Sequence, residues 1–241
     1  MGSDKLHRAL ITGASSGIGK ATALAFAKSG IDLALVGRSL DRLQPVVAAA
    51  KEMGSKTVKS YEIDFAETNQ IKARLSDLLA DFGKIDILVN SAGIGYTGAL
   101  ATMPISDWQQ VINLNLTGVF QCIQGILPTL RQEQGIIVNV ASVAGKSGFP
   151  GWGAYSVSKA GLITLSKVLA AEERDNGVRV VTISPGAVNT PIWDTETVDA
   201  DFDRSKMLTP EVVAETILNA VLLPNFAVIE DVSLMPSAGA L

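Results

Sequence analysis

Hydrophobic and polar positions follow two patterns that alternate along this chain, and the alternation predicts strands separated by helices. Short apolar runs rich in β-branched residues are typical of buried parallel strands, whereas longer segments with apolar positions three and four apart are typical of helices. The predicted strands are 8–12, 32–36, 57–63, 85–89, 135–140, 179–184 and 226–234. The predicted helices are 19–28, 40–53, 68–82, 108–130, 155–176 and 210–222.

This order of elements predicts an α/β fold with right-handed crossovers, in which one Rossmann-like, doubly wound parallel sheet of about seven strands carries helices on both faces. A chain of 241 residues is long enough to bury such a sheet as a single domain spanning 1–241. The segment 190–208 is polar and acidic and has no clear period. We expect it to be a mobile substrate loop, in which short helices are allowed.

Charge and cysteine content exclude several classes of protein. A net charge of −4 and a pI near 5.1 argue against a nucleic-acid or membrane partner, so a small molecule is the expected ligand. The single cysteine, Cys122, rules out an internal disulfide and is expected to pack in the core; together with the absence of a long apolar N-terminal stretch it predicts a cytoplasmic protein. With one cysteine and one histidine, His7, no zinc site of several such ligands can form, and no metal is expected.

A glycine-rich turn follows the first predicted strand and leads into the first helix. Its sequence, TGASSGIG at 12–19, places glycines where the backbone must approach a ligand closely, and the helix N-terminus that follows attracts a pyrophosphate. We therefore predict a dinucleotide site, with an ordinary tight turn as the alternative, because the spacing G-x-x-x-G-x-G departs from the commonest form. The candidate contacts are Gly13, Ser15, Ser16, Gly17, Ile18 and Gly19.

The same residues also satisfy G-x-S-x-G, the nucleophile elbow of hydrolases. In that fold a catalytic histidine follows the serine along the chain. The only histidine here, His7, precedes it, so the hydrolase interpretation fails.

Arg38 and Ser39 follow the second predicted strand, about twenty residues beyond the glycine turn, where an NAD site carries an acidic residue. A guanidinium at this point is suited to a ribose 2′-phosphate, and the serine hydroxyl adds a hydrogen bond. The pair predicts NADP(H) as cofactor; a solvated surface arginine is the alternative.

Tyr155 and Lys159 are four residues apart on a predicted helix and therefore share one face. A free tyrosine, with a pKa near 10, is too weak a base at neutral pH, and a nearby ammonium is expected to lower that pKa so that the phenol can exchange a proton with an alcohol or carbonyl oxygen. Ser142, just beyond the strand 135–140, lies at the sheet edge where its hydroxyl can polarise a carbonyl. The alternatives are an ordinary amphipathic helix and a serine that caps the next turn.

The order of these motifs resembles the short-chain dehydrogenase/reductase family across 5–222. The likeness rests on TGASSGIG, NSAG at 90–93, Asn115 in NLNLTGVF, Ser142, YSVSK at 155–159 and the PG pair at 185–186. It implies an oxidoreductase that transfers hydride between the nicotinamide of NADP(H) and a carbonyl or secondary alcohol, with Tyr155 as proton donor or acceptor. An NADP(H)-binding sensor or scaffold without turnover is the alternative.

The resemblance also implies roles for further residues. Lys159 would hold the nicotinamide ribose, and Asn115 would anchor a water relay behind it, unless Asn115 only satisfies buried backbone. Further implied contacts are Asp64 and Phe65 at the adenine, Asn90, Ala92 and Gly93 in the cofactor cleft, and Pro185, Gly186, Val188 and Thr190 toward the nicotinamide.

Substrate and assembly are less constrained. The 3-oxoacyl carrier-protein reductases of this family usually end in a VNGG segment, whereas 232–237 reads VSLMPS and is more similar to members that reduce small ketones or oxidise 3-hydroxy acids. Five acids against Arg204 and Lys206 in 190–208 favour a neutral carbonyl, and Trp152 is expected in the pocket wall. Family members commonly form dimers or tetramers, so a homodimer or homotetramer through 108–130 and 155–176 is expected.

Overall fold

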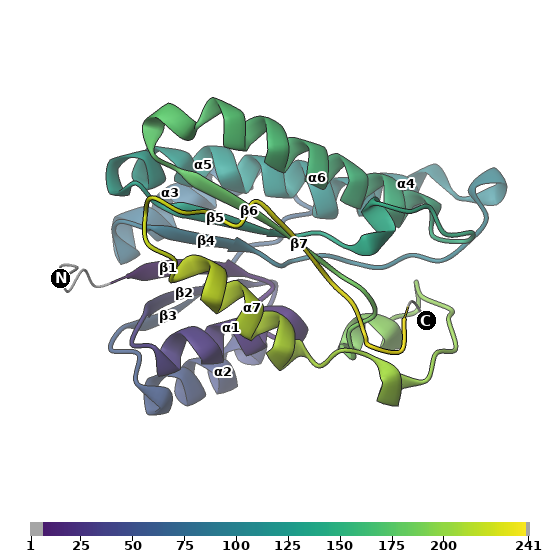
Figure 1. The fold of residues 1–241 in the computed structure, drawn as a ribbon, viewed down its shortest axis with the longest axis horizontal. Helices are drawn as coiled ribbons and strands as arrows, with labels where there is room; N and C mark the ends of the chain where they lie inside the picture. Colours follow the sequence, from purple (N-terminus) through teal and green to yellow (C-terminus); the bar gives the residue numbers. More distant parts are fainter. Residues whose placement is uncertain (1–6, 240–241) are drawn as a thin grey trace.

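The computed structural model describes residues 7–239, and its centre is one parallel sheet with the strand order β3-β2-β1-β4-β5-β6-β7 (Figure 1). The predicted fold class is confirmed. The strands are β1 (Arg8–Thr12), β2 (Asp32–Gly37), β3 (Val58–Glu62), β4 (Ile87–Asn90), β5 (Ile136–Val140), β6 (Arg179–Pro185) and β7 (Asp231–Leu234). The helices are α1 (Gly17–Lys28), α2 (Leu40–Met53), α3 (Ile71–Phe82), α4 (Ile105–Ile112), α5 (Gly118–Glu133), α6 (Gly153–Glu172) and α7 (Pro210–Val221).

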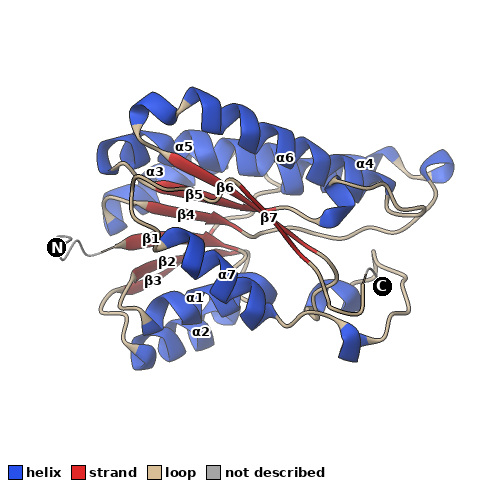
Figure 2. Cartoon of the chain, viewed as in Figure 1, coloured by secondary structure: helices blue, strands red, loops and turns tan. Residues whose placement is uncertain are grey.

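Helices cover both faces of the sheet, which explains why its inner strands are apolar on both sides (Figure 2). One core lies between the sheet and α1, α2 and α7, with Phe26 fully buried in it. The other lies between the sheet and α3, α5 and α6, with Leu75 and Leu78 at its centre. Among the described helices, none is both long and apolar enough to span a membrane.

The strand order reverses between β1 and β4, which are direct neighbours in the sheet. From β1 the chain adds β2 and β3 on one side, and from β4 it adds β5, β6 and β7 on the other. Loops that leave the carboxyl ends at such a reversal part in opposite directions and leave a crevice between them. This topology sets the position of the site.

The predicted helix at 108–130 is in fact two helices joined by a π-helical turn. Helix α4 ends at Ile112, the turn spans Asn113–Thr117, and α5 begins at Gly118. The wider turn carries the buried side chain of Asn115, which binds backbone outside the helix. Such turns are common at functional sites, and because their dihedral angles stay helical, residue periodicity does not reveal them.

The last strand is shorter than predicted, since the pairing with β6 begins at Asp231, with Glu230 O accepting from Thr182 N at 2.9 Å. The guanidinium of Arg179 donates to the carbonyl oxygens of Leu223 and Ala227, at 3.1 and 3.4 Å, and Ala227 N donates to Pro224 O at 2.9 Å, so that 223–227 forms a turn. Phe226 is left 91% exposed. The predicted strand 226–234 therefore began too early, because its first residues are apolar but lie at the surface.

The segment 190–208 contains two short 3-10 turns, Pro191–Asp194 and Arg204–Lys206. It folds back on the loop after β4: Thr97 N donates to Thr197 O at 2.8 Å, and the Thr197 hydroxyl donates to Gly95 O at 2.8 Å. Val198, buried between these contacts, closes the packing. The segment thus covers one end of the crevice.

Candidate active site

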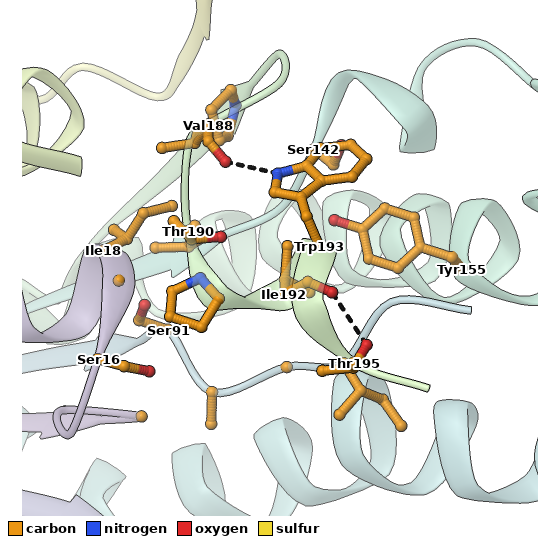
Figure 3. Close-up of a pocket in the computed structure, with 18 of the residues that line it drawn as sticks. Ser16, Ile18, Ser91, Ser142, Tyr155, Val188, Thr190, Ile192, Trp193 and Thr195 are labelled. Carbon is orange, nitrogen blue, oxygen red and sulfur yellow. Dashed lines mark hydrogen bonds between the residues drawn. The ribbon is translucent and has the colours of Figure 1, made fainter. Parts of the chain in front are cut away.

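A cavity of about 730 Å³ lies at the carboxyl edge of the sheet, at the reversal between β1 and β4. Its walls come from the glycine turn before α1, the ends of β2, β4, β5 and β6, the start of α6 and the segment 190–208. Figure 3 shows the end of the cavity that contains Ser142, Tyr155 and Trp193. Its size is typical of a site for a small molecule or cofactor.

Ser142, Tyr155 and Lys159 meet in this cavity, although Ser142 follows β5 and the other two lie on α6. A close approach between the backbones of Gly145 and α6 makes this possible. A Cβ on Gly145 would come within 2.6 Å of the Lys159 carbonyl carbon, so only glycine fits there. The short turn that carries Ser142 is therefore pressed against the helix that carries Tyr155.

The hydroxyl of Ser142 accepts a hydrogen bond from Ala144 N at 3.1 Å, which is the capping contact considered as an alternative role. The cap holds the serine in place at the end of the cavity that Tyr155 also lines. The capping role and a role in the cavity are therefore compatible.

Lys159 is buried and donates from Nζ to Val140 O at 2.9 Å, at the end of β5. Its ammonium lies 5.7 Å from the centre of the Tyr155 ring. Burial disfavours the charged form and lowers the pKa of Lys159 to about 8. The lysine is thus charged at neutral pH but close to its titration.

Burial also acts on Tyr155, and it raises the pKa of the phenol, while the hydrogen bond with Ser142 opposes that rise. The expectation that the lysine ammonium lowers the pKa of Tyr155 is wrong for this geometry. The reason is that burial dominates, while the ammonium donates to Val140 O and lies over the ring, 5.7 Å from its centre. The phenol is therefore in its protonated form at neutral pH, as a proton donor requires.

Asn115 is buried beside this group but does not line the cavity. Its Oδ1 accepts from Ile94 N at 2.9 Å, and its Nδ2 donates to Ile94 O at 2.9 Å and to the Ser158 hydroxyl at 3.1 Å. That hydroxyl donates to Tyr155 O at 2.7 Å. Asn115 satisfies buried backbone, as the alternative role supposed, and ties the loop after β4 to α6.

The glycine turn forms one wall of the cavity through Gly13, Ser15, Ser16, Gly17 and Ile18. Ser16 is the N-cap of α1, yet its side chain makes no capping bond, so N–H groups of the first turn are not satisfied by it. Gly19, in contrast, is buried behind the turn, where a Cβ would lie 2.4 Å from Gly13 O. It allows the turn to close and does not line the cavity.

Two exposed arginines stand at the far end of the cavity. Arg38 and Arg42 both line it, and neither side chain forms an ion pair or hydrogen bond within residues 7–239. Ser39 also lines it and caps α2 by accepting from Arg42 N at 3.4 Å. Arg42 was not predicted; its place in the first turn after Arg38 was the available signal.

The remaining predicted cofactor contacts divide into two groups. Those that line the cavity are Phe65, Ala92, Gly93, Pro185, Gly186, Val188 and Thr190. Asp64 lies in a small neighbouring hollow with Arg38, and its carboxylate accepts from Ala66 N at 2.9 Å. Asn90 is buried in the sheet, where its Nδ2 donates to Asn139 Oδ1 at 2.8 Å. Asp64 and Asn90 are therefore placed to shape the site from outside the cavity.

An aromatic wall closes the end of the cavity near Tyr155, and sequence reasoning anticipated only Trp152 in it. The others are Trp193 and Phe202 of the segment 190–208, together with Phe149 before α6. The indole of Trp193 donates to Val188 O at 2.7 Å (Figure 3). Two aromatic residues within an otherwise acidic loop were the signal that could have revealed this wall.

The cavity fits a dinucleotide phosphate from its own chemistry. Unsatisfied N–H groups at a helix N-terminus suit a pyrophosphate, and two unpaired guanidinium groups at the adenosine end suit a further phosphate. At the opposite end, a phenol, a serine hydroxyl and a buried ammonium converge. Proton transfer to a small oxygen-containing group is the chemistry this end supports.

Comparisons with known proteins agree with this arrangement. The family model described as short chain dehydrogenase matches residues 7–201. The chain is 39% identical over 225 residues to the 3-oxoacyl-(acyl-carrier-protein) reductase of Thermotoga maritima, covering 93% of this chain and 86% of that protein. It is also 39% identical over 205 residues to a protein of the same name from Staphylococcus aureus, covering 83% and 81%.

Solved structures of oxidoreductases are also similar to this chain over nearly its whole length. An alcohol dehydrogenase from Thermococcus sibiricus complexed with 5-hydroxy-NADP has a TM-score of 0.89 and 28% identity, with 98% of both chains covered. A metagenomic short-chain oxidoreductase in complex with NADP has a TM-score of 0.83 and 28% identity, covering 96% of this chain and 97% of that one.

Proposed function

Because this chain belongs to the short-chain dehydrogenase family, whose members are oxidoreductases acting on alcohol and carbonyl groups, we propose that it reduces a ketone with NADPH and that Tyr155 donates the proton. The reverse oxidation of a secondary alcohol uses the same groups. The observation that carries the proposal is the convergence of Ser142, Tyr155 and Lys159 at one end of a dinucleotide-sized cavity.

The cofactor assignment rests on the two arginines and on two related structures. Arg38 and Arg42 are unpaired within the described chain and line the cavity end opposite Tyr155. Both related structures are complexes with NADP or its 5-hydroxy derivative. We assign NADP(H), which when bound supplies or accepts the hydride; Arg38 would hold the 2′-phosphate, and N–H groups of the first turn of α1 would hold the pyrophosphate.

The side chains of the protein supply the proton chemistry. The hydroxyl of Ser142 would hold the substrate oxygen beside Tyr155, because both residues line the same end of the cavity. Tyr155 gives its proton to that oxygen as negative charge develops there. The buried ammonium of Lys159 would hold the nicotinamide ribose, and Asn115 keeps α6 in place through Ser158.

The test is a panel of ketones with NADPH and, in parallel, NADH, followed by absorbance at the nicotinamide band. We expect turnover with at least one neutral ketone and a clear preference for NADPH. Tight NADPH binding without turnover on any ketone would instead favour the sensor function. Equal use of both cofactors would overturn the role given to Arg38.

A further inference from the structure

Three rings of the aromatic wall, Trp152, Trp193 and Phe202, form a chain of contacts that begins at Tyr155. Trp152 meets Tyr155 with ring centres 5.5 Å apart and an interplanar angle of 67°, and it meets Trp193 at 5.6 Å and 71°. Trp193 in turn meets Phe202 at 5.3 Å and 84°. Edge-to-face contacts of this kind leave ring faces and edges available to a further ring.

These rings belong to two separate parts of the chain, the start of α6 and the segment 190–208, and all line the cavity. Trp152 precedes α6, Trp193 lies in the turn Pro191–Asp194, and Phe202 lies beyond it. The hydrogen bond from Trp193 Nε1 to Val188 O fixes the indole plane. The wall is therefore organised before a substrate arrives, which lowers the entropy lost when a flat group binds against it.

Charge at this end of the cavity disfavours an anionic substrate. Of the described residues that line the cavity, the charged ones are Arg38, Arg42, Lys159 and Asp194. The arginines belong to the far end, and Lys159 is bound to Val140 O. Asp194 is paired with Arg204 at 2.6 Å, so among the described lining residues the cation at this end is the buried Lys159, and no exposed cation faces a carboxylate or phosphate.

We infer that the preferred substrate is an uncharged ketone with an aryl ring one or two bonds from the carbonyl. This rests on the proposed function, because the carbonyl must sit at Tyr155 for its substituent to reach Trp152 and then Trp193. A linear aliphatic chain of equal carbon number fills the same space without ring-to-ring contacts. A substrate with a carboxylate on the ring would bring a negative charge toward Asp194.

Four substrates test the inference with NADPH. Phenylacetone and 2-nonanone are both unconjugated methyl ketones of nine carbons; 4-(2-oxopropyl)benzoate adds a charge, and acetoacetyl-coenzyme A is an acyl thioester. We expect kcat/KM for phenylacetone to exceed that for 2-nonanone by about tenfold and those for the two anionic substrates by more. Equal or better use of 2-nonanone or of either anion would overturn the inference and leave the proposed reductase function intact.

The variant Trp193→Leu tests whether the aromatic wall causes the preference for phenylacetone over 2-nonanone. We expect the phenylacetone to 2-nonanone ratio of kcat/KM to fall toward one, and quenching of tryptophan emission by phenylacetone to need a higher concentration. The control is Phe226→Leu, a change of an exposed aromatic residue outside the cavity, which should leave the ratio as it is. An unchanged ratio in folded, NADPH-binding Trp193→Leu would overturn the inference, and absence of turnover with all four substrates would overturn both proposals.

Discussion

The backbone of Gly145 lies directly against that of Lys159, so that a Cβ on Gly145 would be 2.6 Å from the lysine carbonyl carbon and 2.8 Å from Ala160 N. This contact links two elements that are otherwise independent in sequence. It brings the turn that carries Ser142 onto the helix that carries Tyr155. The geometry of the proposed proton transfer thus depends on a residue without a side chain.

Gly145→Ala should therefore lower kcat/KM strongly while the protein still folds. The added methyl group would meet the backbone of Lys159 and Ala160 and must push the turn away from α6, which costs about 1–3 kcal/mol of folding free energy. A displacement of about 1 Å between Ser142 and Tyr155 lowers kcat/KM by about 10²-fold. Steady-state kinetics and thermal unfolding would measure the two effects. Gly148→Ala is the matched control, since a Cβ there meets nothing within 4 Å; equal behaviour of the two variants would contradict the prediction.

Tyr155→Phe should lower kcat by about 10²–10⁴-fold, because the phenylalanine ring keeps the packing against Trp152 but has no proton to give. NADPH binding, measured by fluorescence titration, should change little. Near-normal turnover in this variant would show that another group donates the proton.

The pH dependence of ketone reduction should follow Lys159. With its pKa at about 8, the ammonium is present below that pH and lost above it, whereas the raised pKa of Tyr155 keeps the phenol protonated. We expect kcat/KM to be level below pH 7 and to fall above pH 8, approaching about tenfold per pH unit. Lys159→Met should lack this limb.

The depressed pKa of Lys159 also makes the free energy of unfolding depend on pH, and this quantity rises with pH where kcat/KM falls. Between pH 8 and the ordinary lysine value of 10.5 the unfolded chain binds more protons than the folded one, so the contribution of Lys159 to stability rises with pH in that window. Denaturant unfolding of the wild type and Lys159→Met at pH 7.5 and 10 measures it. The stability of the wild type minus that of Lys159→Met should be larger at pH 10 than at pH 7.5, and a difference that does not grow with pH would refute the assignment.

Arg38→Ala should weaken NADPH binding by about 10- to 100-fold, as expected for loss of charge-assisted hydrogen bonds to a phosphate. NADH lacks that phosphate, and its dissociation constant should change less than about twofold. Arg174→Ala, which removes an exposed arginine outside the cavity, is the control. Equal losses for the two cofactors would exclude a 2′-phosphate contact.

Arg204 holds the covering segment by hydrogen bonds to Asn189 Oδ1 at 3.0 Å, Thr190 O at 3.3 Å and Asp194 Oδ1 at 2.6 Å. Arg204→Ala should speed amide hydrogen exchange in 190–199 and raise the KM for NADPH by about twofold to fivefold, because these contacts are partly exposed. Lys206→Ala, which removes only the exposed pair with Asp203, should do neither. Identical exchange in both variants would contradict the role of Arg204.

The fold was predictable from sequence because β-branched runs and helical spacing report burial directly. The two failures have physical causes that periodicity does not contain. Residues of the π-helical turn keep helical dihedral angles, so Asn115 looked like part of one long helix. The apolar run at 226–229 is largely exposed because Arg179 binds Ala227 O and the strand pairing with β6 begins only beyond it.

The candidate site was predictable where local motifs carry it and less so elsewhere. The glycine turn, Arg38, Ser142, Tyr155 and Lys159 all line the cavity. The pKa of Tyr155 was not predictable, because its direction depends on burial and on where the Lys159 ammonium points. Most of the aromatic wall was not predictable either, since Trp193 and Phe202 line the cavity only because of how the acidic segment 190–208 folds.

The aromatic wall and the proton-transfer group also differ in what supports them. Ser142 and Tyr155 are anchored to β5 and α6, whereas Trp193 and Phe202 sit on a segment outside the sheet and its covering helices. Exchanges at 193 and 202 can therefore alter which ketone is accepted at little cost to the core. For directed evolution, this separates the positions to randomise from those to leave unchanged.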